Sequence, residues 1–94
     1  SVSYKINKFN VISNLPKAKA FVSVIFNDLI EVQCSIIKGN YGLHVQWPSQ
    51  KKDGKWEKLF VIKDKNLKYA VDNEILRIYR MKAGKETNDK FNKE

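Results

Sequence analysis

The chain has one cysteine and one histidine among its 94 residues. A single cysteine cannot form an internal disulfide, and Cys34 lies in an apolar stretch, so we expect a buried thiol in a reducing, cytoplasmic compartment. The zinc-binding patterns CxxC and HExxH are absent, and no second histidine is present to share a metal ion. We therefore expect neither a metal nor any other cofactor.

Catalytic patterns are equally scarce. The four glycines form neither GxGxxG nor a phosphate-binding P-loop. Cys34 and His44, which would have to act as nucleophile and base, fall on opposite faces of their expected strands. On its polar face, His44 fits a half-exposed hydrogen-bonding residue better than a ligand. The sequence thus predicts no enzymatic activity and no small-molecule substrate.

Long apolar runs are also missing. No segment approaches the roughly 20 apolar residues that cross a bilayer, and the chain does not start with an apolar leader, so we expect no membrane contact.

With 43% hydrophobic residues in a chain of 94, one hydrophobic core can form but not two. We expect one domain over residues 4–82, followed by a flexible polar tail over residues 83–94.

Most of the chain shows the two-residue alternation of β-strands. The segments with this pattern are 4–12, 18–26, 29–38, 43–47 and 56–62. Asn27–Asp28 has the composition of a tight turn between the second and third segments, and residues 49–55 read as a polar loop with a turn at Asp53–Gly54. An antiparallel sheet of about five strands follows from this pattern.

The period changes to that of a helix at Asp64 or Asn66. The apolar residues on one arc of this helix are Leu67, Ala70, Val71, Ile75, Ile78 and Tyr79. Arg80 and Lys82 suit the end of a helix, and Ala83–Gly84 supplies a stop. The predicted fold is therefore α+β, a small antiparallel sheet packed with one C-terminal amphipathic helix.

Positive charge is abundant, because 18 Lys and Arg against 10 Asp and Glu give a net charge of +8. Such a surface attracts polyanions, and DNA or RNA is the first partner to consider; alternatively, the lysines only keep the protein in solution. The uneven distribution of the lysines along the chain favours binding to DNA or RNA. Residues 51–68 hold seven lysines against three acidic residues and carry half of the net charge.

Six lysines of this segment are candidates for nucleic-acid contacts: Lys51, Lys52, Lys55, Lys63, Lys65 and Lys68. The first three lie in the loop before the expected strand 56–62, and the last three surround the start of the helix. Free backbone N–H groups and the helix dipole favour phosphate at a helix N-terminus. We predict that the six lysines form one phosphate-binding surface.

Three aromatic residues lie close to the basic segment, where an exposed ring can stack on an unpaired base. Tyr41, between two turn glycines, is expected to be exposed and joins the candidate nucleic-acid-binding residues. Trp47 alternates in phase with Leu43 and Val45, which favours the core over the surface. Trp56 directly follows a turn and fits either location.

The segment GNYGLHVQWPS at 39–49 is similar to the glycine-bounded turn and GLFVxMPS motif of the SpoVG (septation regulator) family. Upstream, AFVSVIFNDLIEVQCSIIKG resembles the hairpin of that family, and downstream LRIYR resembles its C-terminal helix. The resemblance covers residues 4–82. His44 stands where the family has an aromatic residue, Trp47 stands where it has Met, and the His-Pro motif and arginine before the helix are absent.

The resemblance implies a small sheet with a helix, dimerisation through strand exchange or edge pairing, and binding to DNA or RNA. The implied role is regulatory, linked to cell division, sporulation or virulence genes. It maps family binding residues onto Lys51 and Lys52, and onto the region from Lys63 to Lys68. Lysines replace arginine there, and the two are not equivalent at planar contacts.

Two functions remain open from the sequence. The first is a regulator that binds DNA or RNA through phosphates with weak sequence preference. The second is a protein-interaction module that recruits a partner in cell-division regulation through a sheet edge or through a helix face bearing Tyr69 and Leu76. Salt dependence of nucleic-acid binding separates the two.

Overall fold

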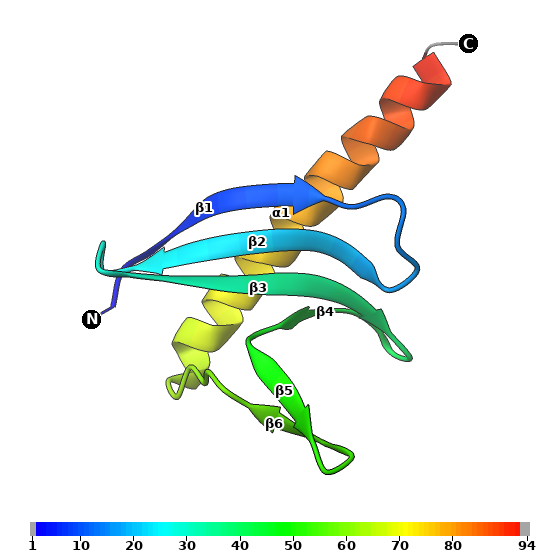
Figure 1. The fold of residues 1–94 in the computed structure, drawn as a ribbon. Coiled ribbons are helices and arrows are strands. Elements are labelled where there is room, and N and C mark those ends of the chain that lie inside the picture. Colours follow the sequence, from blue (N-terminus) through cyan, green and yellow to red (C-terminus); the bar gives the residue numbers. More distant parts are fainter. Residues whose placement is uncertain (1, 93–94) are drawn as a thin grey trace.

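The computed structural model describes the backbone of residues 2–92 and the side chains of residues 2–84. In that part of the chain six strands precede one helix (Figure 1): β1 (Tyr4–Val11), β2 (Ala18–Phe26), β3 (Ile30–Gly39), β4 (Gly42–Gln46), β5 (Ser49–Lys52), β6 (Lys55–Lys58) and α1 (Lys65–Asn92). Strands β1 to β4 form an antiparallel sheet in chain order, and β5 pairs only with β6. Helix α1 crosses one face of the four-stranded sheet (Figure 1). The predicted α+β class is confirmed.

The turn between β2 and β3 forms where the sequence places it. Asn27 and Asp28 have φ angles of 52° and 56°. These left-handed conformations suit a two-residue turn whose twist matches that of the strands. The backbone N–H of Leu29 donates to the carbonyl oxygen of Phe26 at 2.9 Å and closes the turn.

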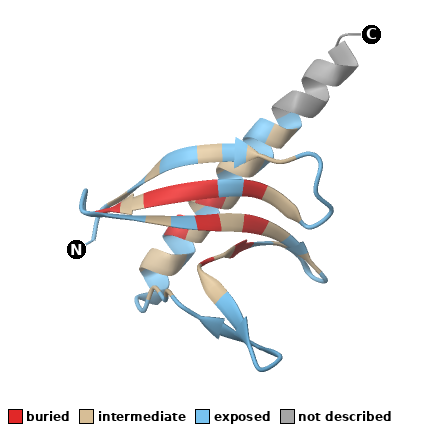
Figure 2. Ribbon diagram, in the orientation of Figure 1, coloured by how far each residue is buried: buried red, intermediate tan, exposed pale blue. Residues whose placement is uncertain are grey.

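The core lies between the sheet and α1 (Figure 2). Its buried apolar members are Ala20, Val22, Val24, Phe26, Cys34, Ile36, Val45, Trp47, Val71 and Ile75. Alternate residues of β2 supply four of them, as the two-residue period predicts. Val71 and Ile75, one helical turn apart, supply the helix side, as the predicted apolar arc requires.

The predicted polar loop at 49–55 is wrong, because most of it belongs to a second β-hairpin. Asp53 and Gly54 have φ angles of 53° and 78° and form its turn. The predicted strand 56–62 is correspondingly too long, since β6 ends at Lys58. An Asp-Gly turn is a strong hairpin signal, but the polar flanks of this one lack the alternation that marks a half-buried strand. The sheet of about five strands is therefore four strands plus a separate pair.

Helix α1 begins with a side-chain cap and continues beyond its expected end. Asp64 Oδ1 accepts a hydrogen bond from the backbone N–H of Leu67 at 3.1 Å. The expected stop at Ala83–Gly84 is not a helix end, because Gly84 has no positive φ and the helical backbone continues to Asn92. The division into a domain over 4–82 and a flexible tail over 83–94 stays a prediction. Residues 93–94 and the side chains from residue 85 lie outside the described part.

Trp47 connects the end of β4 to the helix. Its side chain is 9% exposed, so of the two locations open from the sequence the core is the correct one. The indole Nε1–H donates to Asp72 Oδ1 at 2.9 Å, and Lys68 Nζ binds Asp72 Oδ2 at 2.6 Å. The Trp47 ring also packs against Phe26 and Phe60, with centroid distances of 6.2 and 5.3 Å. These contacts fix α1 and the segment after β6 to the sheet.

Replacing Asp72 by Ala should lower the free energy of unfolding by about 1–3 kcal/mol, because the indole N–H of Trp47 loses its acceptor in a nearly buried position. Urea denaturation followed by circular dichroism measures the loss. Glu74→Ala is the matched control, since it breaks an exposed ion pair with Arg77 on the same helix and should cost less than about 1 kcal/mol. Equal losses in the two variants would show that the Trp47–Asp72 contact adds nothing.

Candidate nucleic-acid interface

A groove of about 910 Å³ lies between β4 and the chain that runs from β6 to the start of α1. Its charged lining consists of Lys17, Lys58, Lys63, Lys65 and Lys68. No carboxylate lines this groove among the residues that the structure describes. The groove therefore presents a local excess of positive charge, which attracts an anionic ligand.

The path of the chain after the hairpin brings these lysines together. The backbone N–H groups of Leu59 and Phe60 both donate to the carbonyl oxygen of Pro48, at 2.9 and 3.3 Å. This holds the extended segment from β6 to α1 beside the end of β4. Lys58 lies at the start of that segment, and Lys63 lies just before the helix. Lys17 lies in the connection between β1 and β2. Its carbonyl oxygen accepts a hydrogen bond from the backbone N–H of Lys38 at 2.9 Å.

The hairpin lysines divide between its two faces. Lys51 pairs with Trp56 and Ser49 with Lys58 in the strand register, so these four residues share a face. Ser49, Trp56 and Lys58 line the groove, which identifies this face as the one turned toward it. Lys52 and Lys55 pair with each other on the opposite face. All three predicted hairpin lysines are exposed, but only Lys51 shares a face with the groove-lining residues.

At the helix start, part of the predicted phosphate-binding capacity is already in use. The Asp64 cap occupies one of the free N–H groups, and Lys68 is paired with Asp72. Lys63 and Lys65 are exposed and have no ion-pair partner among the described residues. These two lysines are the helix-start cations that remain free to meet a ligand.

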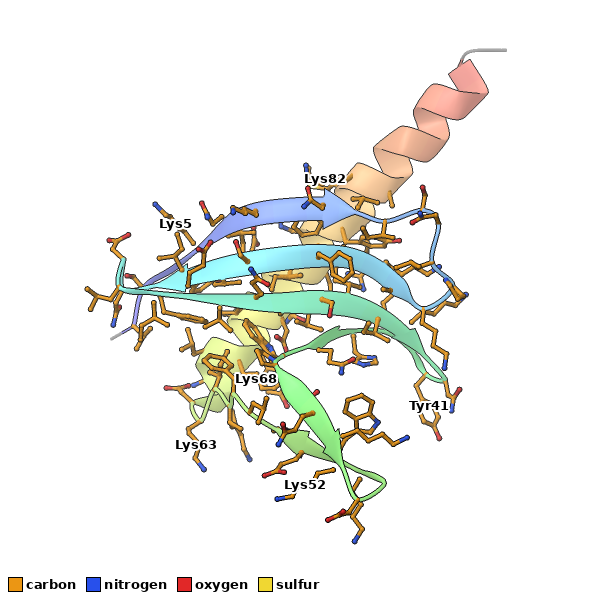
Figure 3. All side chains as sticks on the ribbon, in the orientation of Figure 1. Lys5, Tyr41, Lys52, Lys63, Lys68 and Lys82 are labelled. Atoms are coloured by element: carbon orange, nitrogen blue, oxygen red, sulfur yellow. The ribbon has the colours of Figure 1, made fainter. Side chains whose placement is uncertain are left out.

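Among the aromatic candidates, Trp56 is the one that meets the groove. Its side chain is 67% exposed and lines the groove, so the surface is the correct one of its two possible locations. Tyr41 is fully exposed, as predicted, at the turn between β3 and β4. Figure 3 shows it at the opposite end of the sheet from Lys63, and it does not line the groove.

Sequence reasoning missed Lys17 and Lys58 as candidate site residues. Lys58 lies inside the basic segment and could have been found from strand register, because it is two residues from Trp56 and so shares its face. Lys17 is far away in sequence and reaches the groove only through the pairing of β2 with β3. No local signal in the sequence reports that placement.

Cys34 and His44 do not form a reactive couple. Cys34 lies on the helix-facing side of the sheet, together with the paired residues Ile36 and Val45. His44 pairs with Ile37 and lies on the other side. Burial raises the pKa of the Cys34 thiol to about 12, and the negative charge of Asp72 adds to the shift. The thiol is therefore protonated, and weakly nucleophilic, at neutral pH.

Among the described residues, no three His, Cys, Asp or Glu side chains gather where a metal ion would bind. Nor is any helix there both long and apolar enough to cross a bilayer.

Cys34 should react with Ellman's reagent at pH 8 at least about a hundredfold more slowly in the folded protein than in urea, because its pKa is raised. Similar rates of modification with and without urea would contradict the assignment of a buried thiol.

The same pKa shift makes the stability of the protein depend on pH. The unfolded thiol ionises near its ordinary pKa of 9.0 while the folded one stays protonated to about 12, so the free energy of unfolding should fall as pH rises between these values.

No curated protein matches the chain. The family model for SpoVG matches residues 2–81, which include the four-stranded sheet, the hairpin and most of the described helix. This match supports a regulator related to septation or sporulation and agrees with the motif at residues 39–49. The chain belongs to the SpoVG family.

Proposed function

We propose that this protein is a regulator that binds DNA or RNA through phosphate contacts made by the lysines of the β5–β6 hairpin and the start of α1. The observation that carries the proposal is the groove beside β4, which is lined by five lysines and by no described carboxylate. Family membership supports the regulatory role, and the net charge of +8 supports a polyanionic ligand.

Phosphate contact is the chemistry that these residues support best. Lysine binds phosphate as a point charge, without the planar geometry that arginine brings to a base edge. Phosphate contacts position a nucleic acid but carry no direct sequence information, so weak sequence preference follows. As part of the same proposal, the protein acts in the cytoplasm, has no cofactor and catalyses no reaction.

Reversing the charge of Lys51 and Lys52 together should weaken binding to all sequences alike. Each lost phosphate contact should lower the slope of log K against log salt by about one, because fewer counterions are released. Fluorescence anisotropy of labelled DNA and RNA at several salt concentrations measures both effects. The two side chains are exposed, so folding should be unaffected.

The control reverses Lys5 and Lys82, which lie away from Lys52 and Lys63 in Figure 3 and change the net charge by the same amount. It should retain most of the affinity and the slope. If the Lys51–Lys52 variant binds with wild-type affinity and slope, these two lysines make no phosphate contact, and the binding surface does not extend beyond the groove lysines.

A homodimer is the second part of the proposal. The four-stranded sheet is open, with β1 and β4 at its edges, and open edges favour pairing with another chain. The resemblance of residues 39–49 to the family motif implies the same assembly. Light scattering should give twice the chain mass of 11.0 kDa. A monomer mass at concentrations on the order of tens of micromolar would contradict an obligate pair.

The alternative, a protein-interaction module, draws on the outer face of α1. Tyr69 is 62% exposed there, but Leu76 is partly buried against the core, so the patch expected from the sequence is reduced to one ring. Binding of a protein partner without salt-dependent binding of nucleic acid would favour this alternative.

A further inference from the structure

The Trp56 side chain is exposed without contributing to the core. The indole of Trp47 is 9% exposed and packs against two phenylalanine rings, whereas that of Trp56 is 67% exposed. In the described part of the chain no aromatic ring packs on Trp56. An indole left in water forgoes a large hydrophobic gain, so this ring is available to a ligand that covers it.

Positive charge surrounds this ring on its own face of the hairpin. Lys51 lies directly opposite Trp56 in the strand register, and Lys58 lies two residues away on the same strand. Both therefore project from the same face as the indole. Beyond them, the groove that Trp56 lines continues to Lys63 and Lys65. A flat apolar surface with cations beside it complements a flat base whose backbone carries neighbouring phosphates.

We propose that the ligand of this groove is single-stranded nucleic acid, with one unpaired base stacked on the Trp56 indole and the adjacent phosphates held by Lys51 and Lys58. This inference rests on the proposed function and names the class of nucleic acid that the site selects. In a duplex each base is covered by its neighbours above and below, so no base face is free for the indole. The lysines attract duplex and single strand alike, and the ring distinguishes them.

The test compares an oligo(dT) of about 12 nucleotides with the duplex that it forms with oligo(dA), by fluorescence anisotropy with the full chain. Wild-type protein should bind the single strand more tightly. Trp56→Ala should weaken single-strand binding roughly tenfold and duplex binding less than about twofold, since one stacked base is worth about 1–3 kcal/mol. Trp56→Phe should keep most of the affinity, because a phenyl ring still stacks.

A second readout separates stacking from a general loss of structure. Oligo(dT) should quench tryptophan emission in the wild type but not in Trp56→Phe, where the remaining indole of Trp47 is buried and hydrogen-bonded to Asp72. Tyr69→Ala is the matched control, because it removes a ring of similar exposure from the outer face of α1. It should leave both affinities unchanged.

Three results would overturn the inference while leaving phosphate binding intact. These are equal affinity of the wild type for single strand and duplex, wild-type single-strand affinity in Trp56→Ala, and a change of oligomeric mass in Trp56→Ala. The last would show that the ring belongs to an interface between copies. Failure of the wild type to bind either polymer would instead overturn the proposed function and this inference together.

Discussion

The carboxylate of Asp72 holds together the parts of the molecule that build the groove. One oxygen accepts the indole N–H of Trp47 at the end of β4, and the other binds Lys68 on its own helix. The ring of Trp47 in turn packs on Phe60, beyond the hairpin. One wall of the groove is β4 and another is the start of α1, so this contact sets their separation. The positions of the groove lysines therefore depend on a residue that does not line the groove.

The same contact limits what Lys68 can do. Its ammonium group lies at the groove but is neutralised by Asp72, so it serves the attachment of the helix more than the attraction of an anion. Asp64 acts in a similar way at the helix N-terminus, where its side chain takes an N–H that would otherwise face a ligand. Net attraction in the groove comes from the lysines that lack such partners, Lys63 and Lys65 among them.

Strands and helix could be predicted from the sequence where one face of an element is buried. In β2 the buried apolar positions alternate, and in α1 Val71 and Ile75 are one turn apart, because burial in the core imposes the period of the backbone on the residue pattern. The exposed hairpin has no buried face and hence no such pattern. Placement of Lys17 beside the groove depends on pairing between distant strands, which no local pattern encodes. The charge of residues 51–68 predicted where the candidate site lies, but not which lysines share a face.

The β5–β6 hairpin is attached to the fold at its base and contributes nothing to the core. Every residue of β6 is exposed, as are three of the four residues of β5. Substitutions there change the exposed surface while costing little stability, provided that the left-handed turn at Asp53 and Gly54 is kept. The hairpin is thus the part of the fold in which the surface chemistry can evolve without a compensating change in the scaffold.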